Sequence, residues 1–166
     1  TIAILGSTGS IGKTLLEILT KEKKNINIKL LSSNKNYQKL LKQAKIFNVK
    51  NLIILDKSSY KKLKKNKNLR HLNIYNNFKS FKKIFNNQKI DYTMNAITGI
   101  DGLEPTLDII RWTKKIAIAN KEAIICGWDL IKKKLERNKT LFIPVDSEHF
   151  SIWYAIKNNK INNIQN

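Results

Sequence analysis

Three glycines at three-residue spacing, Gly6, Gly9 and Gly12, stand between a short β-branched run and a leucine-rich helical pattern. This order predicts a strand, a tight turn and a helix, the context that a dinucleotide-binding turn requires. We expect Gly6 to adopt backbone angles that other residues avoid, Gly9 to let a pyrophosphate approach the main chain, and Gly12 to let the helix pack closely on its strand.

The first turn of the predicted helix supplies the groups that a phosphate would need. Its exposed N–H groups point along the helix axis, and the hydroxyls of Thr8 and Ser10 add donors beside them. The alternative interpretation is an ordinary strand-to-helix turn that is rich in glycine and binds no nucleotide.

Strand-like and helix-like segments alternate along the rest of the chain. The predicted strands span residues 1–5, 27–31, 51–55, 72–75, 90–96, 115–119 and 140–145. Helical segments follow Gly12 and span residues 37–48, 60–63, 78–85, 102–113 and 120–137, the last with Asn120 as its cap. This alternation predicts an α/β fold, a Rossmann-like, doubly wound and mostly parallel sheet with helices on both faces. In such sheets ligands bind beyond the carboxyl ends of the strands.

The length of 166 residues suits one domain, or one domain with a fragment of another. We expect a nucleotide-binding domain over residues 1–145 and the truncated start of a second domain over residues 146–166. The sequence has no apolar run of about 18 residues and no apolar signal segment before the first strand, which predicts no membrane partner. Together with the lone Cys126, this favours a reducing compartment, the cytoplasm of a bacterium, with a plastid-type compartment as the lesser option.

The net charge of +20 and the pI of 10.1 are also typical of nucleic-acid-binding proteins. Here, however, lysines account for nearly all of the excess and are scattered among asparagines and isoleucines, as an AT-rich genome would produce. Only Arg70, Arg111 and Arg137 could offer the planar guanidinium that base recognition favours. We therefore expect no nucleic-acid partner, although the charge should favour anionic ligands.

The end of the second predicted strand bears on the choice of cofactor. About 20 residues beyond the glycines, an NAD-binding fold usually places a carboxylate for the ribose 2′-hydroxyl. This chain instead has Ser32, Ser33, Asn34, Lys35 and Asn36 there, which favours the 2′-phosphate of NADP. The same residues could also form a polar loop in which Asn36 caps the next helix.

Two loops at later strand ends carry charged residues. Lys121 and Glu122 follow one strand, and Asp146 and Glu148 follow another, two residues apart. Paired carboxylates can hold Mg²⁺ or Mn²⁺, but two ligands are too few for a tight site, so a third would come from elsewhere. Alternatively, Asp146 and Glu148 form an ordinary helix start, and Lys121 and Glu122 form a solvated pair.

Four motifs together resemble the 1-deoxy-D-xylulose 5-phosphate reductoisomerase family. They are GSTGSIG at 6–12, GIDGLEPTLDII at 99–110, IANKEA at 118–123 and PVDSEHFSIW at 144–153. The resemblance implies an enzyme of isoprenoid precursor synthesis that depends on NADPH and a divalent metal. Such an enzyme rearranges 1-deoxy-D-xylulose 5-phosphate, a sugar phosphate, and reduces the resulting aldehyde to 2-C-methyl-D-erythritol 4-phosphate.

The resemblance also implies a role for each matching residue. Contacts to the cofactor are implied for Gly6, Thr8, Gly9, Ser10, Ile11, Gly12, Asn34, Lys35, Asn36, Asn120 and Glu122, with Lys35 and Asn36 at the 2′-phosphate. Lys121, Ser147 and Glu148 would face the substrate as catalytic residues, and Asp146 and Glu148 would bind the metal. The chain departs from the family at Ser33-Asn34, where a pair of small residues, often Ala-Gly, is usual.

The family's chain is more than twice this length, so the resemblance implies that this segment alone is inactive. The resemblance also implies that the full-length chain forms a homodimer. Two other interpretations remain open from the residues themselves. One is a different NADP-dependent dehydrogenase of the same fold, such as a relative of the semialdehyde or homoserine dehydrogenases, and the other is a nucleotide-binding module without catalytic activity.

Overall fold

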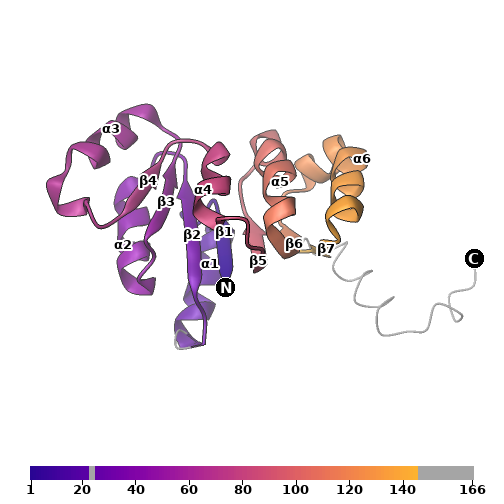
Figure 1. Ribbon diagram of the computed structural model, residues 1–166, viewed down its shortest axis with the longest axis horizontal. Helices are drawn as coiled ribbons and strands as arrows, with labels where there is room; N and C mark the ends of the chain where they lie inside the picture. Colours follow the sequence, from indigo (N-terminus) through magenta and orange to yellow (C-terminus); the bar gives the residue numbers. More distant parts are fainter. Residues whose placement is uncertain (23–24, 146–166) are drawn as a thin grey trace, which may run out of the picture.

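The computed structural model describes residues 1–22 and 25–145, which form one seven-stranded sheet (Figure 1). Every adjacent pair of strands in it is parallel. In chain order the strands are β1 (Ile2–Leu5), β2 (Ile28–Ser33), β3 (Asn51–Ile54), β4 (Asn73–Tyr75), β5 (Ile90–Asn95), β6 (Thr113–Ile118) and β7 (Leu141–Pro144). Their order across the sheet is β4-β3-β2-β1-β5-β6-β7. The predicted α/β class with a mostly parallel sheet is therefore confirmed.

Helices cover both faces of this sheet (Figure 1). They are α1 (Ser10–Lys21), α2 (Tyr37–Phe47), α3 (Lys57–Lys65), α4 (Phe81–Phe85), α5 (Leu103–Ile109) and α6 (Lys121–Asn138). Two separate apolar clusters lie on the two faces. Leu16 of α1, Leu40 of α2 and Leu63 of α3 pack in one cluster. Phe81 of α4, Ile109 of α5 and Ile131 of α6 pack in the other, so the chain changes face between β4 and β5.

The predicted helix over residues 102–113 differs most from the structure, and that over residues 78–85 begins as a 3₁₀ turn (Phe78–Ser80) before α4. The former consists of a 3₁₀ turn (Ile100–Gly102), the short α5, and a second 3₁₀ turn (Ile110–Trp112) that leads directly into β6. The Thr140 hydroxyl lies 2.9 Å from the carbonyl oxygens of both Ile110 and Thr113, on either side of the point where the helix gives way to the strand. This contact holds the helix end against the first residue of the strand. Sequence periodicity does not report such a long-range contact.

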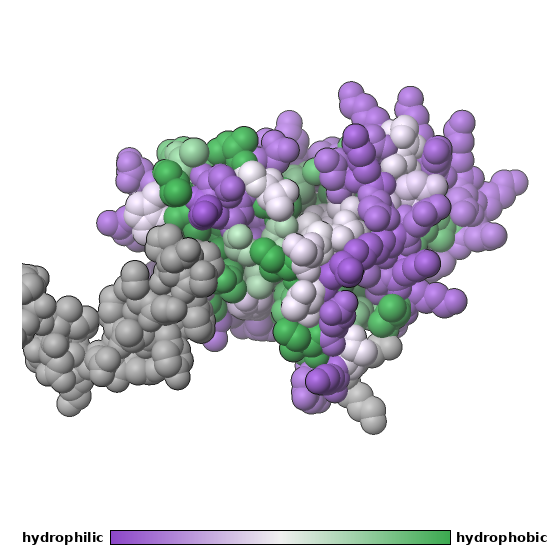
Figure 2. Space-filling view, turned by 180° about the vertical axis from the view of Figure 1, so that it is seen from behind, coloured by the Kyte–Doolittle hydropathy of each residue, from purple (hydrophilic) through white to green (hydrophobic). Residues whose placement is uncertain are grey.

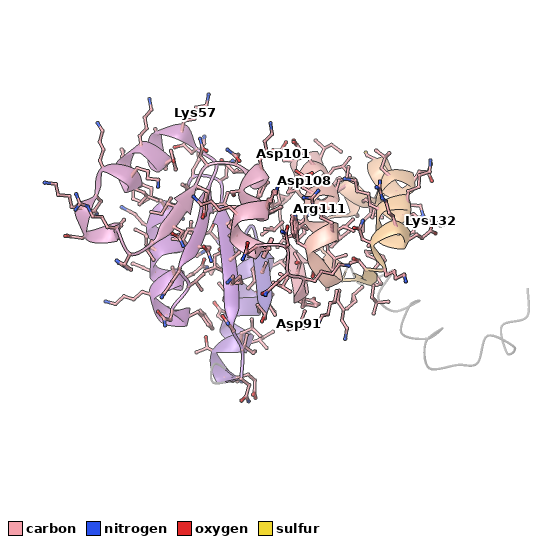
Figure 3. All side chains as sticks on the ribbon, viewed as in Figure 1. Lys57, Asp91, Asp101, Asp108, Arg111 and Lys132 are labelled. Carbon is pink, nitrogen blue, oxygen red and sulfur yellow. The ribbon has the colours of Figure 1, made fainter. Side chains whose placement is uncertain are left out.

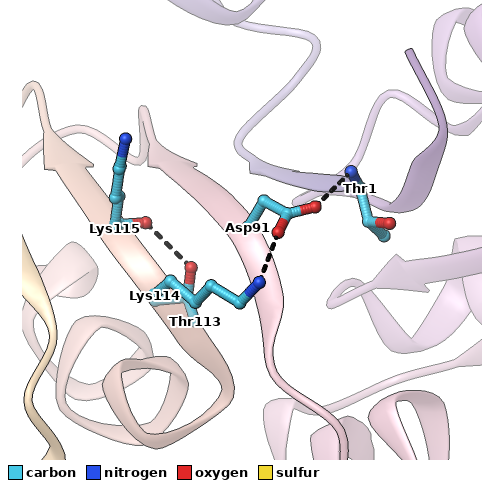
Figure 4. Close-up of polar contacts among 5 residues, drawn as sticks. All are labelled: Thr1, Asp91, Thr113, Lys114 and Lys115. Carbon is cyan, nitrogen blue, oxygen red and sulfur yellow. Dashed lines mark hydrogen bonds and ion pairs between the residues drawn. The ribbon is translucent and has the colours of Figure 1, made fainter. Parts of the chain in front are cut away.

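At the amino-terminal edge of the sheet, Asp91 joins three strands (Figure 4). Its carboxylate accepts hydrogen bonds from the Thr1 amino group and from Lys114 Nζ, each at 2.8 Å. The hydrogen bond from Lys114 is the largest cause that lowers the pKa of Asp91 to about 2. On β6 the Thr113 hydroxyl donates to the carbonyl oxygen of Lys115 at 2.8 Å. These polar contacts lie at the end of the sheet opposite to the site described next.

The surface agrees with the high content of lysine. Figure 2 shows hydrophilic side chains gathered densely over the half of the molecule that contains α2 and α3. Within the described residues, no helix is long and apolar enough to cross a membrane.

Candidate dinucleotide-binding cleft

The strand order reverses between β1 and β5, and the loops that follow these two strands meet at the carboxyl edge of the sheet. The ladder between them runs from the pair Ile2 and Tyr92 to the pair Leu5 and Asn95. Beyond it, the Ala96 N–H donates to the Leu5 carbonyl oxygen at 2.9 Å. A reversal of this kind is where doubly wound sheets bind their ligands.

The glycine turn fills the space beside the β5 loop. Gly6 has φ +73°, and a β-carbon on it would lie 2.7 Å from the Ala96 carbonyl oxygen, so two independent reasons exclude a side chain. Gly12 is constrained by contact alone, because a β-carbon there would lie 2.6 Å from the Gly6 carbonyl oxygen. The expectations for Gly6 and Gly12 as conformational and packing glycines are confirmed. At Gly9 the nearest atom would be 3.4 Å away, so its contact with a pyrophosphate stays a prediction.

Helix α1 begins directly after this turn with its first amides open. Gly9 is the N-cap residue, and no side chain of the described residues caps this end. The side chains of Ser10 and Ile11 are exposed there. The helix start therefore presents N–H groups to solvent at the mouth of the cleft, an arrangement that suits an anion.

Two serines at the end of β2 hold the turn from the other side. Ser32 Oγ accepts a hydrogen bond from the Gly6 N–H at 3.0 Å, and the Ser7 N–H donates to the Ser32 carbonyl oxygen at 2.8 Å. The hydroxyls of Thr8 and Ser33 lie 2.7 Å apart in a further hydrogen bond. Ser32 and Ser33 are buried. Their hydroxyls thus shape the turn, a role that the sequence analysis did not assign to them.

The next three residues, Asn34, Lys35 and Asn36, are exposed, and Asn34 lines the cleft at this end. Asn36 Oδ1 accepts a hydrogen bond from the Lys39 N–H at 3.0 Å, so Asn36 caps α2 as the alternative interpretation predicted. The Asp56 N–H donates to the Asn34 carbonyl oxygen at 3.0 Å, which links this loop to the end of β3. Lys35 lies between these two anchored residues, close to the carboxyl end of β2.

Two ammonium groups lie next to the turn. Lys39 Nζ donates to the Thr8 carbonyl oxygen at 2.9 Å. Desolvation lowers the pKa of Lys39, and the neighbouring charge of Lys13 lowers it further. Two close positive charges beside open helix amides produce a potential that favours a polyanionic ligand.

The cleft itself consists of two adjoining hollows of about 220 Å³ and about 250 Å³. Both are lined by Ala96, Ile97 and Thr98 of the β5 loop. The first hollow also has Gly6, Thr8, Gly9, Ser32, Ser33, Asn34, Leu55 and Asp101 on its walls. The second also has Ile11, Gly99, Ala119, Asn120, Lys121 and Glu122. The two hollows, which together make the groove, therefore bring together seven predicted cofactor residues from three separate loops, Gly6, Thr8, Gly9, Ile11, Asn34, Asn120 and Glu122. Ser10, Gly12, Lys35 and Asn36 do not line either hollow.

Sequence reasoning missed the β5 loop and Leu55 as parts of this groove. Figure 3 shows Asp101 at the edge of the sheet that carries the groove and Asp91 at the opposite edge. A signal was available, because Leu55 and residues 96–98 directly follow the strands β3 and β5. The rule that ligands bind beyond strand ends applies to these strands as it does to β1 and β2.

Asn120 ties the β5 loop to the start of α6. Its Oδ1 accepts a hydrogen bond from the Ala123 N–H at 2.8 Å, which confirms it as the helix cap. Its Nδ2 donates to the carbonyl oxygens of Ile97, at 2.7 Å, and Gly99. The side chain is 3% exposed, whereas those of Lys121 and Glu122 are exposed on the rim. The implied contacts of these three residues with cofactor and substrate stay predictions.

The predicted metal and substrate residues Asp146, Ser147 and Glu148 lie outside the described residues. Strand β7, which ends at Pro144, pairs in parallel with β6, so the carboxyl ends of both strands lie at the same edge of the sheet as Lys121. Among the side chains of residues 1–22 and 25–145, no group of three His, Cys, Asp or Glu could hold a metal ion. The metal site therefore stays a prediction.

A doubly wound parallel sheet, a glycine turn at its switch point and a groove over the strand ends define a Rossmann-like domain of the dinucleotide-binding class. The family model described as 1-deoxy-D-xylulose 5-phosphate reductoisomerase matches residues 2–127. The chain belongs to this family.

Relatives and solved structures agree with this assignment. The 1-deoxy-D-xylulose 5-phosphate reductoisomerase of Pelagibacter ubique is 61% identical over 168 residues, covering 99% of this chain and 42% of the relative. The Zymomonas mobilis enzyme in complex with NADPH has 32% identity and a TM-score of 0.79, covering 89% of this chain and 39% of that one. A DOX-P reductoisomerase with NADPH, fosmidomycin and magnesium has 29% identity and a TM-score of 0.80 over 89% and 36% of the two chains. The chain thus spans less than half the length of these relatives.

Proposed function

We propose that this chain is the NADPH-binding, N-terminal part of an enzyme that converts 1-deoxy-D-xylulose 5-phosphate to 2-C-methyl-D-erythritol 4-phosphate in non-mevalonate isoprenoid precursor synthesis. The observation that carries the proposal is the groove at the switch point, where three family motifs meet around the open start of α1. The solved relative from Zymomonas mobilis is in complex with NADPH, which supports the choice of cofactor.

The residues of the groove fit a dinucleotide phosphate. The pyrophosphate would lie at the N-terminus of α1, against the amides and side chains of Thr8, Gly9, Ser10 and Ile11. Gly6 and Gly12 let the turn keep this shape, since neither position has room for a β-carbon. The exposed Asn34, Lys35 and Asn36 would surround the adenosine 2′-phosphate, where a positive charge and amide donors favour NADPH over NADH.

NADPH supplies the hydride for the reduction when it is bound. The role of this chain is to hold and orient it, with Asn120 and Glu122 along the groove toward the nicotinamide end. Lys121 lies exposed on the same rim and would face the anionic sugar phosphate. Ser147 and Glu148 would complete the substrate contacts, and Asp146 and Glu148 would hold Mg²⁺ or Mn²⁺ with a third ligand from elsewhere. A solved DOX-P reductoisomerase in complex with magnesium supports the choice of metal.

The proposal also covers the domain boundary, the oligomeric state and the cellular location of the enzyme. We place the boundary between the cofactor domain and the start of the catalytic domain at residues 145 and 146. The full-length chain would act as a homodimer in the bacterial cytoplasm. Similarity to enzymes of bacteria such as Pelagibacter ubique and Clostridium tetani supports this location.

Titration of the 166-residue chain with NADPH, followed by cofactor fluorescence and calorimetry, tests the cofactor site. We expect weak but saturable binding that is tighter for NADPH than for NADH. Ser10→Glu should abolish it, because a carboxylate at the open helix start repels the pyrophosphate. Ile18→Glu is the matched control on the same helix, at a side chain that is 59% exposed, and should bind normally. Equal binding by both variants would refute the proposed pyrophosphate position.

A further inference from the structure

Helix α2 reaches back over the glycine turn through a buried glutamine. Gln43 Nε2 donates a hydrogen bond to the Ser7 carbonyl oxygen at 2.8 Å, and the Ser7 hydroxyl donates to Gln43 Oε1, also at 2.8 Å. Gln43 is 8% exposed and Ser7 is fully buried. The two residues therefore satisfy each other's polar groups in a reciprocal pair away from solvent, where an unpaired amide would be costly.

Lys39, one helical turn before Gln43, makes a second contact with the next residue of the turn. Its Nζ donates to the Thr8 carbonyl oxygen at 2.9 Å. Positions four apart lie on the same face of a helix, so one face of α2 holds two successive carbonyl groups of the glycine turn. The N-terminal end of the same helix carries Asn36, next to Lys35 at the adenosine end of the groove.

These contacts fix the direction of the neighbouring peptide groups. In a trans peptide the carbonyl points opposite to the following N–H, and no described peptide bond is cis. The Ser7 carbonyl points to Gln43, so the Thr8 N–H points away from α2. The same contacts engage the carbonyl oxygens of Ser7 and Thr8. These oxygens carry partial negative charge and would repel a phosphate if they turned toward the groove.

We propose that Gln43 and Lys39 are positioning residues for the dinucleotide pyrophosphate. They hold the glycine turn in an orientation in which its carbonyl oxygens face α2 and not the groove. This inference rests on the proposed function. Because Gln43 is uncharged and buried away from the adenosine end, its effect must reach every cofactor that has a pyrophosphate, with or without a 2′-phosphate. A residue that contacts the 2′-phosphate, such as the proposed Lys35, would instead change NADPH binding alone.

The test compares Gln43→Met with Gln38→Met, the same substitution at an exposed position of the same helix. Kd is measured for NADPH and for NADH at a temperature well below the thermal midpoint of each variant. Loss of the two hydrogen bonds in Gln43→Met should weaken both cofactors by the same factor, about tenfold. Gln38→Met should bind both cofactors like the unmodified chain.

A second pair of variants covers the case in which Gln43→Met does not fold. Lys39→Met removes the donor to Thr8 at a half-buried position, and Lys39→Arg retains a donor and the charge. We expect weaker binding of both cofactors in Lys39→Met and recovery in Lys39→Arg.

If Gln43→Met folds and its Kd values are unchanged, the inference is overturned, even if its thermal midpoint falls. If Gln43→Met does not fold, unchanged Kd values in folded Lys39→Met overturn it in the same way. Absence of NADPH binding by the unmodified chain would instead overturn the proposed function.

Discussion

Gly12 of helix α1 lies so close to Gly6 that a β-carbon on Gly12 would be 2.6 Å from the Gly6 carbonyl oxygen. Gly6 belongs to the turn that opens the groove and Gly12 to the start of α1, and the atoms that surround a β-carbon at either position are main-chain atoms, which cannot yield as a flexible side chain could. The packing of the helix on the turn and the shape of the turn are therefore one structural requirement.

This relationship predicts different results for two similar substitutions. Gly12→Ala should lower the free energy of unfolding by about 2 kcal/mol, because main-chain atoms must move to admit the methyl group. Gly9→Ala, where the nearest atom would be 3.4 Å away, should change stability by less than about 1 kcal/mol. The same Gly9 variant should bind NADPH about tenfold more weakly, since its methyl group would meet the pyrophosphate. Chemical denaturation and cofactor titration measure the two effects, and a Gly9→Ala chain with normal NADPH affinity would contradict the proposed position.

The adenosine end can be tested through the choice between two cofactors. Lys35→Met should raise the Kd for NADPH about tenfold, since a charged hydrogen bond to the 2′-phosphate is lost. The Kd for NADH should stay the same. Lys29→Met serves as the control for net charge, because Lys29 is also exposed and lies in β2, the strand that precedes Lys35. Equal weakening of both cofactors in Lys35→Met would show that Lys35 does not recognise the 2′-phosphate.

Asn120 should be more important for stability than its position on the rim suggests. Its buried side chain contacts Ala123, Ile97 and Gly99, so Asn120→Ala should lower the free energy of unfolding by about 2 kcal/mol. Asn138→Ala, at the other end of α6, removes a single exposed hydrogen bond and should have little effect. Comparable denaturation midpoints for the two variants would argue against the role of Asn120 as the link between the β5 loop and α6.

The N-cap of α3 predicts a specific dependence of stability on pH. Asp56 accepts hydrogen bonds from the Ser59 N–H at 2.8 Å and the Ser58 hydroxyl at 2.7 Å. The backbone hydrogen bond from Ser59 is the largest cause that lowers the pKa of Asp56 from 3.8 to about 2. A carboxylate with a lowered pKa in the folded state stabilises the fold above its ordinary pKa, and this contribution is lost as the pH falls from about 4 to about 2.

Asp56→Asn isolates this contribution, because asparagine can still cap the helix but does not titrate in this range. The difference in thermal midpoint between the original chain and Asp56→Asn should shrink by a few degrees as the pH falls from about 5 to about 2. A constant difference over this range would mean that the Asp56 cap does not depend on its charge.

The metal site is tested in a protein of the full family length that carries these residues. Asp146→Asn should reduce metal-supported turnover of 1-deoxy-D-xylulose 5-phosphate by at least about 100-fold and leave the Kd for NADPH nearly unchanged. Steady-state rates over a series of Mn²⁺ concentrations, together with a cofactor titration, separate the two effects. Near-normal rates at low Mn²⁺ would exclude Asp146 as a metal ligand.

Periodicity and glycine spacing were enough to predict the seven strands of the sheet and the glycine turn, because these depend on residues close together in the sequence. The caps at Asn36 and Asn120 were predicted for the same reason. The partners of the Ser32 and Gln43 side chains were not, since Gly6 and Ser7 lie 26 and 36 residues away along the chain. A hydroxyl or amide acquires such a partner only when the fold brings two segments together.

The ladder between β1 and β5 joins the half of the sheet formed by β1 to β4 to the half formed by β5 to β7. The floor of the groove is therefore the central seam of a continuous sheet. Separating β1 from β5 would break main-chain hydrogen bonds at the middle of the sheet. The two halves of the sheet therefore cannot move apart and close over a ligand. A dinucleotide would enter a preformed slot at little conformational cost, and any movement that encloses it must come from segments outside this sheet.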